Sequence, residues 1–239
     1  MRLTNLFIAL MILSFASLNA QNLQLHYDFR HSLYGGELST ENYFTATYEM
    51  FKADENGSTF MFIDYDFSYD QKNPGLIYGE ISHDFKLKKC PIQPHIEYNG
   101  GLGSIKGTTT SFSIPNSFLA GASYPFQLGN VFMSTYVVYK LNAFKKVSHD
   151  AQWTVTWSTS LFNKKLTIDG FMDTWSENRD REGTKTVSGK KLIFLSEPQF
   201  WYNITPKISF GSETEISRNF HGKSNKWYFI PTIAGKWVI

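Results

Sequence analysis

Apolar and polar residues alternate along most of the chain in short segments. Between residues 23 and 30, Leu23 and Leu25 occupy alternate positions and polar residues fill the positions between them. The clearest alternation comes later, where Trp153 and Val155 are interleaved with glutamine and threonine. Because successive side chains of a strand point to opposite faces, this pattern predicts strands with one apolar and one polar face.

Twelve such segments follow one another, separated by clusters of Gly, Pro, Asn, Asp, Ser and Lys. No helical periodicity of useful length occurs after Ala20. Strands are predicted at residues 23–30, 42–52, 58–69, 76–87, 92–99, 117–124, 131–141, 152–161, 166–176, 192–202, 208–217 and 227–239. Twelve is an even number, as in single-chain bacterial membrane barrels.

The connections between these segments alternate in length. Counted in chain order, the odd-numbered connections are long, as at 31–40, 100–113 and 177–190. The even-numbered connections are tight turns, as at 54–57 and 163–165. Long loops at one end and short turns at the other are typical of outer-membrane barrels, whose two termini lie in the periplasm. A soluble β-sandwich has no reason to sort its loops in this way, and its core would not tolerate unpaired charges in mid-strand.

The N-terminus has the features of a secretory signal peptide. Arg2 supplies a positive charge, residues 6–18 are almost wholly apolar, and Ala20 ends a small-residue cleavage motif. We therefore expect a signal peptide over residues 1–20 and a single barrel domain over residues 21–239. No later segment offers about 18 consecutive apolar residues, so a membrane-spanning chain of this sequence must form a closed barrel.

Composition and motifs exclude several classes of function. Aromatic residues make up 17%, the net charge is only +2, and Cys90 is the single cysteine. This composition favours neither a nucleic-acid partner nor a disulfide framework. The sequence contains no Gly-x-Ser-x-Gly, His-Glu-x-x-His or Walker-type motif. His83 and Asp84 are adjacent but fall on opposite faces of their strand, so we expect no catalytic residue, no metal site and no cofactor.

The polar faces, which a membrane barrel turns inward, are rich in acids. The expected inward-facing residues are Asp28, Glu49, Phe62, Asp64, Asp66, Tyr78, Glu80, Asp84, His95, Glu97, Asp173, Trp175, Glu197, Gln199, Glu213 and Glu215. Their carboxylates either pair with Arg30, Lys140 and Arg218 or face water in the lumen. An acidic wall interleaved with aromatic rings suits a neutral or cationic solute with a flat ring, and it repels phosphate.

Several of these segments resemble a known family. The run from Glu41 to Lys52 and the aromatic, acid-bearing run from Phe60 to Phe67 resemble the second and third strands of the Tsx family of nucleoside-specific outer-membrane channels. The segment from Leu76 to Ser82 resembles the strand that follows, and the segment from Asp169 to Trp175 resembles the Gly-aromatic strand of that family. The chain looks like a Bacteroidetes-type branch of these proteins, with shorter loops.

The resemblance implies a monomeric twelve-stranded barrel with a narrow channel for nucleosides. It implies that the channel is lined by Glu49, Phe62, Asp64, Tyr78, Glu80, Asp173 and Trp175, and the inward pattern adds Glu197. We therefore expect a passive channel in the outer membrane of a Gram-negative cell, whose partners are the lipid bilayer and a small solute. The alternatives are a barrel enzyme that acts on lipid and a plugged structural or adhesion barrel.

Overall fold

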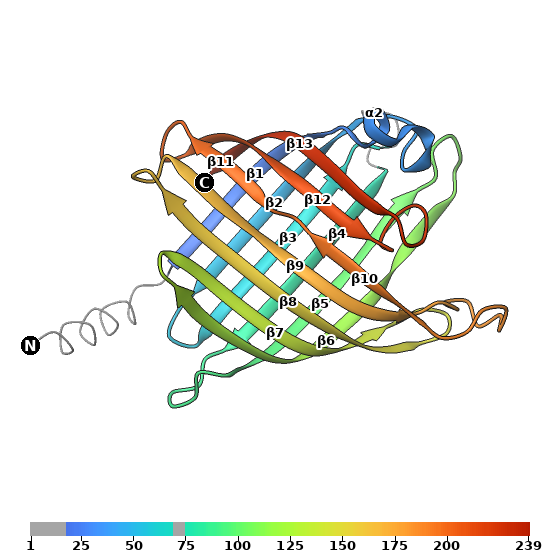
Figure 1. The fold of residues 1–239 in the computed structure, drawn as a ribbon, viewed down its shortest axis with the longest axis horizontal. Helices are drawn as coiled ribbons and strands as arrows, with labels where there is room; N and C mark the ends of the chain where they lie inside the picture. Colours follow the sequence, from blue (N-terminus) through green and yellow to red (C-terminus); the bar gives the residue numbers. More distant parts are fainter. Residues whose placement is uncertain (1–17, 69–74) are drawn as a thin grey trace, which may run out of the picture.

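The computed structural model describes residues 18–68 and 75–239, which form a closed antiparallel barrel (Figure 1). Most of the predicted signal peptide and part of the predicted 58–69 strand lie outside the described residues. The strands are β1 (Leu18–Asp28), β2 (Tyr43–Ala53), β3 (Gly57–Asp66), β4 (Leu76–Phe85), β5 (Gln93–Ser104), β6 (Ser111–Leu128), β7 (Val131–Asn142), β8 (Ser148–Leu161), β9 (Leu166–Asn178), β10 (Lys190–Ser196), β11 (Gln199–Asn203), β12 (Ile208–Arg218) and β13 (Trp227–Val238).

The barrel closes because β1 pairs with both β2 and β13. Each strand from β2 to β9 pairs with its neighbours in sequence. β10 and β11 both pair with β9 on one side and β12 on the other, so together they occupy one position in the wall. The wall therefore has twelve positions, and the predicted twelve-stranded barrel is confirmed.

The interruption between β10 and β11 lies at Glu197 and Pro198, inside what the pattern predicts as one strand. Proline has no N–H to donate to a ladder. The pairing continues around it, because the Glu197 amide donates to Phe171 and the Thr214 amide donates to the Pro198 carbonyl, each at 3.1 Å. Gly170, at φ +147°, permits this approach, since a Cβ there would lie 2.5 Å from the Glu197 carbonyl oxygen.

The two faces of the wall differ as the alternation predicts. Leu25 is half exposed on the outside, whereas Gln24 and His26 beside it are buried. On β8, Trp153 is exposed and Gln152 is buried. In a closed barrel the buried polar face is the lumenal one, so the apolar side chains form the outer, lipid-facing surface.

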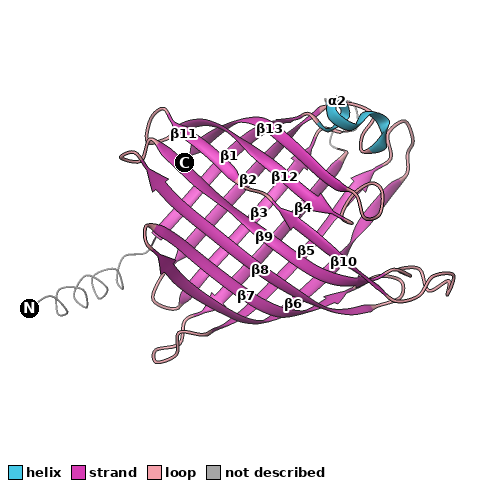
Figure 2. Ribbon diagram, in the orientation of Figure 1, coloured by secondary structure: helices cyan, strands magenta, loops and turns pink. Residues whose placement is uncertain are grey.

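The structure departs from the predicted loops in two places. The predicted 100–113 loop is mostly strand, because β5 continues to Ser104 and β6 begins at Ser111 after a shift in register near Asn99. The predicted 31–40 loop contains a short helix, α2 (Arg30–Tyr34), and a 3-10 turn, η1 (Gly35–Glu37), drawn in cyan in Figure 2. None of the helices among the described residues is long and apolar enough to cross a membrane.

The two ends of the barrel are distinct. One end, called here the turn end, carries the C-terminus and the connections 54–56, 129–130, 162–165 and 204–207 (Figure 1). The other, called here the loop end, carries α2 and the 179–189 and 219–226 loops. The predicted sorting of connections holds for most of them. It is weaker at 86–92, which is a longer turn-end connection than predicted.

Candidate functional site

Five of the eight predicted channel residues form two rows across β2, β3 and β4. Glu49, Phe62 and Glu80 are successive cross-strand partners, and Asp64 pairs with Tyr78 in the next row. Residues paired across strands share a face, and this face is lumenal because Glu49 accepts a hydrogen bond from the buried Asn22 amide. The structure therefore brings these five residues into one lumenal patch.

Hydrogen bonds and ring contacts hold this patch in place. The Tyr78 hydroxyl donates to the Glu80 carboxylate, and the Thr47 hydroxyl donates to the Asp64 carboxylate, each at 2.5 Å. The rings of Phe62 and Tyr78 lie 6.1 Å apart between centroids. All of these side chains remain partly exposed, so they face the accessible part of the lumen.

The remaining predicted acids come from the opposite part of the wall. Counted from β1, β4 holds the fourth of the twelve wall positions, and β10 and β11, which flank Glu197, hold the tenth. The two positions therefore face each other across the barrel. The carboxylate of Glu197 nevertheless lies close enough to Glu80, Asp64 and Glu213 to interact with each electrostatically. Glu80 interacts in the same way with Asp173 on β9. The lumen is therefore narrow at this level, and its facing walls are both acidic.

Trp175 lies on the lumenal face as predicted, but its ring is not open to the lumen. It packs with Ile193 and Leu195 in a small apolar cluster. Phe220 from the 219–226 loop covers it edge-on at 5.7 Å, and the Lys140 ammonium lies 4.6 Å above the ring. Trp175 therefore holds the 219–226 loop and Lys140 in place. The sequence pattern did not indicate that this loop covers the ring.

Two lumenal cations, Lys140 and Lys236, lie within electrostatic reach of the facing acids, Lys140 near Glu80 and Lys236 near Glu213. Lys140 donates to Gln152 and Lys236 lies 4.0 Å above the Trp201 ring, with the Asp169 carboxylate 3.8 Å away. The expected pairing of lumenal acids with Lys140 is not observed within ion-pair distance among the described residues. Lys236 was not singled out from the sequence, although it continues the lumenal alternation of β13.

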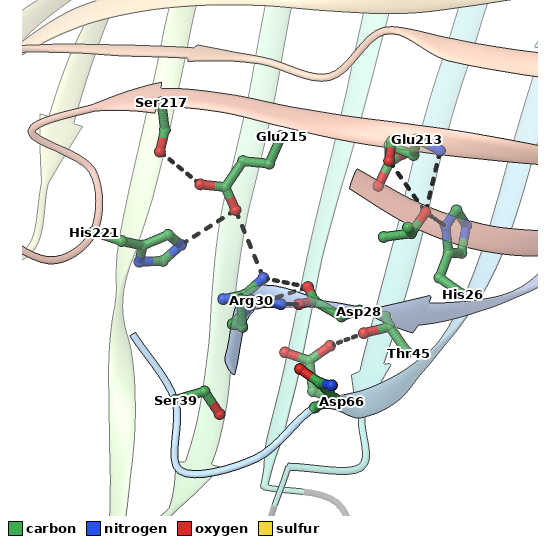
Figure 3. Close-up of polar contacts among 12 residues, drawn as sticks. His26, Asp28, Arg30, Ser39, Thr45, Asp66, Glu213, Glu215, Ser217 and His221 are labelled. Carbon is green, nitrogen blue, oxygen red and sulfur yellow. Dashed lines mark hydrogen bonds and ion pairs between the residues drawn. The ribbon is translucent and has the colours of Figure 1, made fainter. Parts of the chain in front are cut away.

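Arg30 forms the main ion-pair centre, at the loop end (Figure 3). Its guanidinium donates to Asp28 through Nε at 2.9 Å and through a second nitrogen at 2.8 Å, and it lies 3.6 Å from Glu215. Ser217 donates to the other Glu215 oxygen, and His221 approaches Glu215 at 3.8 Å. Burial holds the pKa of His221 below its usual value, despite the opposing effect of the Glu215 carboxylate. Two predicted lumenal acids are thus paired with Arg30, as expected.

Arg218 is placed differently from the prediction. It alternates with the lumenal Ser217 and so points away from the lumen, where it lies 5.7 Å from the Trp227 ring and bonds Asn225. It cannot neutralise lumenal carboxylates from that side. The expected role of Arg218 is therefore wrong, because it depended on a strand end at which side-chain direction is hard to assign.

A serine, a histidine and two acids meet near the turn end, but not in a catalytic order. Asp84 accepts hydrogen bonds from both His95, at 2.8 Å, and Ser123, at 2.5 Å. His95 also contacts Glu97 at 3.3 Å. A nucleophilic serine needs a base on its own hydroxyl, and here that hydroxyl bonds the acid. His83 instead bonds Thr59 on the outer face.

The described residues contain no group of three or more His, Cys, Asp or Glu side chains arranged to hold a metal ion. The carboxylates in the lumen approach one another without converging on one point.

Comparison with solved structures identifies the fold. A porin, NanC, matches at a TM-score of 0.55 with 9% identity, covering 91% of this chain and 98% of that one. LpxR from Salmonella typhimurium matches at 0.48 with 9% identity, covering 91% and 99%. The likeness to the NanC porin concerns the fold alone, which is that of an outer-membrane β-barrel. None of the curated proteins is similar in sequence. A family model described as "Domain of unknown function (DUF5020)" matches residues 20–239, and the chain therefore belongs to the DUF5020 family.

Proposed function

We propose that this chain is a passive channel in the outer membrane of a Gram-negative cell. It acts as a monomer and admits small cationic and neutral polar solutes while it disfavours anions. The observation that carries the proposal is the approach of Glu197 on one wall to Glu80 and Asp64 on the facing wall. Any solute that crosses the barrel at this level passes between carboxylates.

Electrostatics give this arrangement its selectivity. At 4 Å and an effective dielectric constant of about 20, a unit charge interacts with one carboxylate by about 4 kcal/mol. The interaction is attractive for a cation and repulsive for a phosphate. Lys140 and Lys236 are held against tryptophan rings and offset part of the negative field, but the lumenal carboxylates at this level outnumber them.

Nucleosides are the solutes that the lumenal patch suits best. Phe62 and Tyr78 offer ring faces for a base, and Asp64 and Glu80 beside them accept hydrogen bonds from ribose hydroxyls or base amino groups. The resemblance of these strands to the Tsx family supports the same solute. A free nucleoside satisfies both requirements without the charge of a phosphate.

A plugged structural barrel is the second candidate, and one observation favours it. Lumenal side chains along β5 to β8 are almost fully buried, among them Asn99, Leu119, Val138 and Thr154. Lumenal side chains of β1 and of β10–β13 are mostly buried as well, such as His26, Trp201 and Ile230, and those that remain partly exposed lie mainly on β2–β4. A lipid-directed enzyme is less well supported, since Ser123 and His95 both bond Asp84.

The test is ion conductance of the purified barrel in planar bilayers. We expect discrete channels whose reversal potential in a salt gradient shows preference for K⁺ over Cl⁻. Glu80→Gln and Glu197→Gln should each lower that preference, and Glu182→Gln, in an exposed loop, should not. A barrel that inserts but never conducts is plugged, and channels without cation preference contradict the proposed selectivity.

Nucleoside block of the same current tests the solute. Loss of a hydrogen bond to a charged group costs about 1.5–3 kcal/mol, so Glu80→Gln should weaken block by roughly tenfold or more. Nucleoside monophosphates should block and pass poorly. Equal passage of phosphorylated and free nucleosides would leave only a general pore.

A further inference from the structure

Two phenylalanines near the turn end face the lumen and remain exposed. Phe51 follows the lumenal Glu49 by two residues on β2, and Phe60 precedes the lumenal Phe62 by two on β3, so both share its face. Their exposed fractions are 37% and 36%. An aromatic ring left open toward water is unfavourable, and such a surface commonly marks a binding site.

Lumenal aromatic residues differ in how far they are covered: Phe132, at the turn end of β7, is exposed like Phe51 and Phe60, and others are buried. Trp201 and Tyr228 also lie on the lumenal face, and both are fully buried, at 0% exposure. Trp201 is covered by Lys236, and Tyr228 bonds Glu37 and the 219–226 loop. No described side chain covers Phe51 and Phe60 in the same way.

The two rings continue the aromatic patch of the candidate site. Tyr78 and Phe62 are 6.1 Å apart between centroids, and Phe62 and Phe60 are 6.2 Å apart. Phe60 and Phe51 are direct cross-strand partners, which places their Cβ atoms about 4.5–5.5 Å apart. The four rings therefore form one track along β4, β3 and β2, from the narrow acidic level toward the turn end.

Polar groups accompany the track on both sides. Glu49 and Glu80 are the cross-strand partners of Phe62, and Ser82 is the partner of Phe60 on β4. A solute that lies flat on a ring thus has hydrogen-bond acceptors at its edge. Ring faces flanked by polar groups suit molecules with a flat face and a polar rim, such as nucleosides and sugars.

We propose that Phe51 and Phe60 form a second binding site for such ring solutes, beyond the narrow level, which receives them from Phe62 and Tyr78. This inference rests on the proposed function and adds to it a defined route on the periplasmic side. Successive rings about 6 Å apart let a solute move from one stacking position to the next without full release.

The test is binding of adenosine to the full barrel in detergent, measured by calorimetry and by saturation-transfer NMR. The variant is Phe51→Leu/Phe60→Leu, which keeps apolar bulk and removes the ring faces. The control is Phe132→Leu, which removes an exposed phenylalanine at the same end but on β7. Heat-modifiable migration of each variant establishes that the barrel has folded.

We expect the double variant to weaken adenosine binding at least about fivefold, since stacking of a base on an aromatic ring typically contributes that much. Saturation transfer to the base protons should fall with it, and the control should bind as the unmodified protein does. If the unmodified protein conducts and binds adenosine but the double variant binds equally well, this inference fails and the channel stands. If the unmodified protein neither conducts nor binds adenosine, the proposed function fails as well.

Discussion

Replacement of Arg30 by methionine tests whether the loop-end ion-pair centre stabilises the barrel. The side chains of Arg30, Asp28 and Glu215 are 17%, 6% and 10% exposed, so the cluster is largely removed from water. Arg30 donates twice to Asp28 and lies over the Tyr43 ring at 5.1 Å. Methionine keeps most of the apolar stem and removes every one of these interactions.

The expected loss follows from leaving the acids without their partner. Breaking a buried ion pair by removing one member costs about 3–5 kcal/mol, because the remaining charge stays buried. We therefore expect Arg30→Met to lower the free energy of unfolding by about 3–5 kcal/mol. The double variant Arg30→Met/Asp28→Asn should recover part of the lost stability, because Asp28→Asn removes one of the two uncompensated charges.

Urea unfolding of the barrel in lipid vesicles, followed by tryptophan fluorescence, measures both quantities. Arg179→Met is the matched control, since among the described residues that exposed guanidinium bonds one backbone carbonyl; it should cost less than about 1 kcal/mol. A loss below 1 kcal/mol for Arg30→Met would refute the reasoning. So would a double variant less stable than Arg30→Met alone.

Three further predictions concern the membrane and the loop end. The protein should fractionate with outer membranes and migrate as a heat-modifiable band, because a closed hydrogen-bond network resists unfolding; a detergent-free soluble monomer would contradict this. Val155→Arg on the lipid face should cost about 2–4 kcal/mol of folding into bilayers, whereas the lumenal Thr156→Arg should fold; the reverse result would exchange inside and outside. Hydrogen bonds from Tyr228 and Lys226 hold the pKa of Glu37 at about 2, against an ordinary 4.5. The contact of Glu37 with Tyr228 and Lys226 should therefore persist above pH 4.5 and be lost as the pH falls toward 2. Hydrogen exchange in the loop between β1 and β2 measures this loss. Faster exchange of that loop already at pH 6 would be inconsistent with the prediction.

The sequence by itself determined the class of fold and the direction of most side chains. A strand has a repeat of two residues, so Leu25 and Gln24 are assigned to opposite faces without knowledge of any neighbour. The same argument placed Glu49, Phe62 and Glu80 on the lumenal face, and the structure agrees. Alternation is a local property, which is why it could be read from the chain alone.

Element ends and long strands were less well determined. The Gly-rich stretch around Gly101 resembles a loop, yet it belongs to β5, where a Cβ at Gly101 would lie 2.4 Å from the Ile77 carbonyl oxygen. Glycine is needed there because a neighbouring strand approaches closely. Local composition gave no information about that neighbour, since it lies elsewhere in the sequence.

Only the tertiary structure decided which side chains meet across the lumen. Glu80 and Glu197 are far apart in the chain, and closure of the barrel brings them within electrostatic reach. Closure likewise decided that Phe220 covers Trp175, whereas Phe51 and Phe60 stay open. The two-residue repeat of a strand determines whether each side chain faces the lumen or the lipid. The distance across the barrel depends on how many strands close the wall and how far each loop folds inward, and no single segment encodes either quantity.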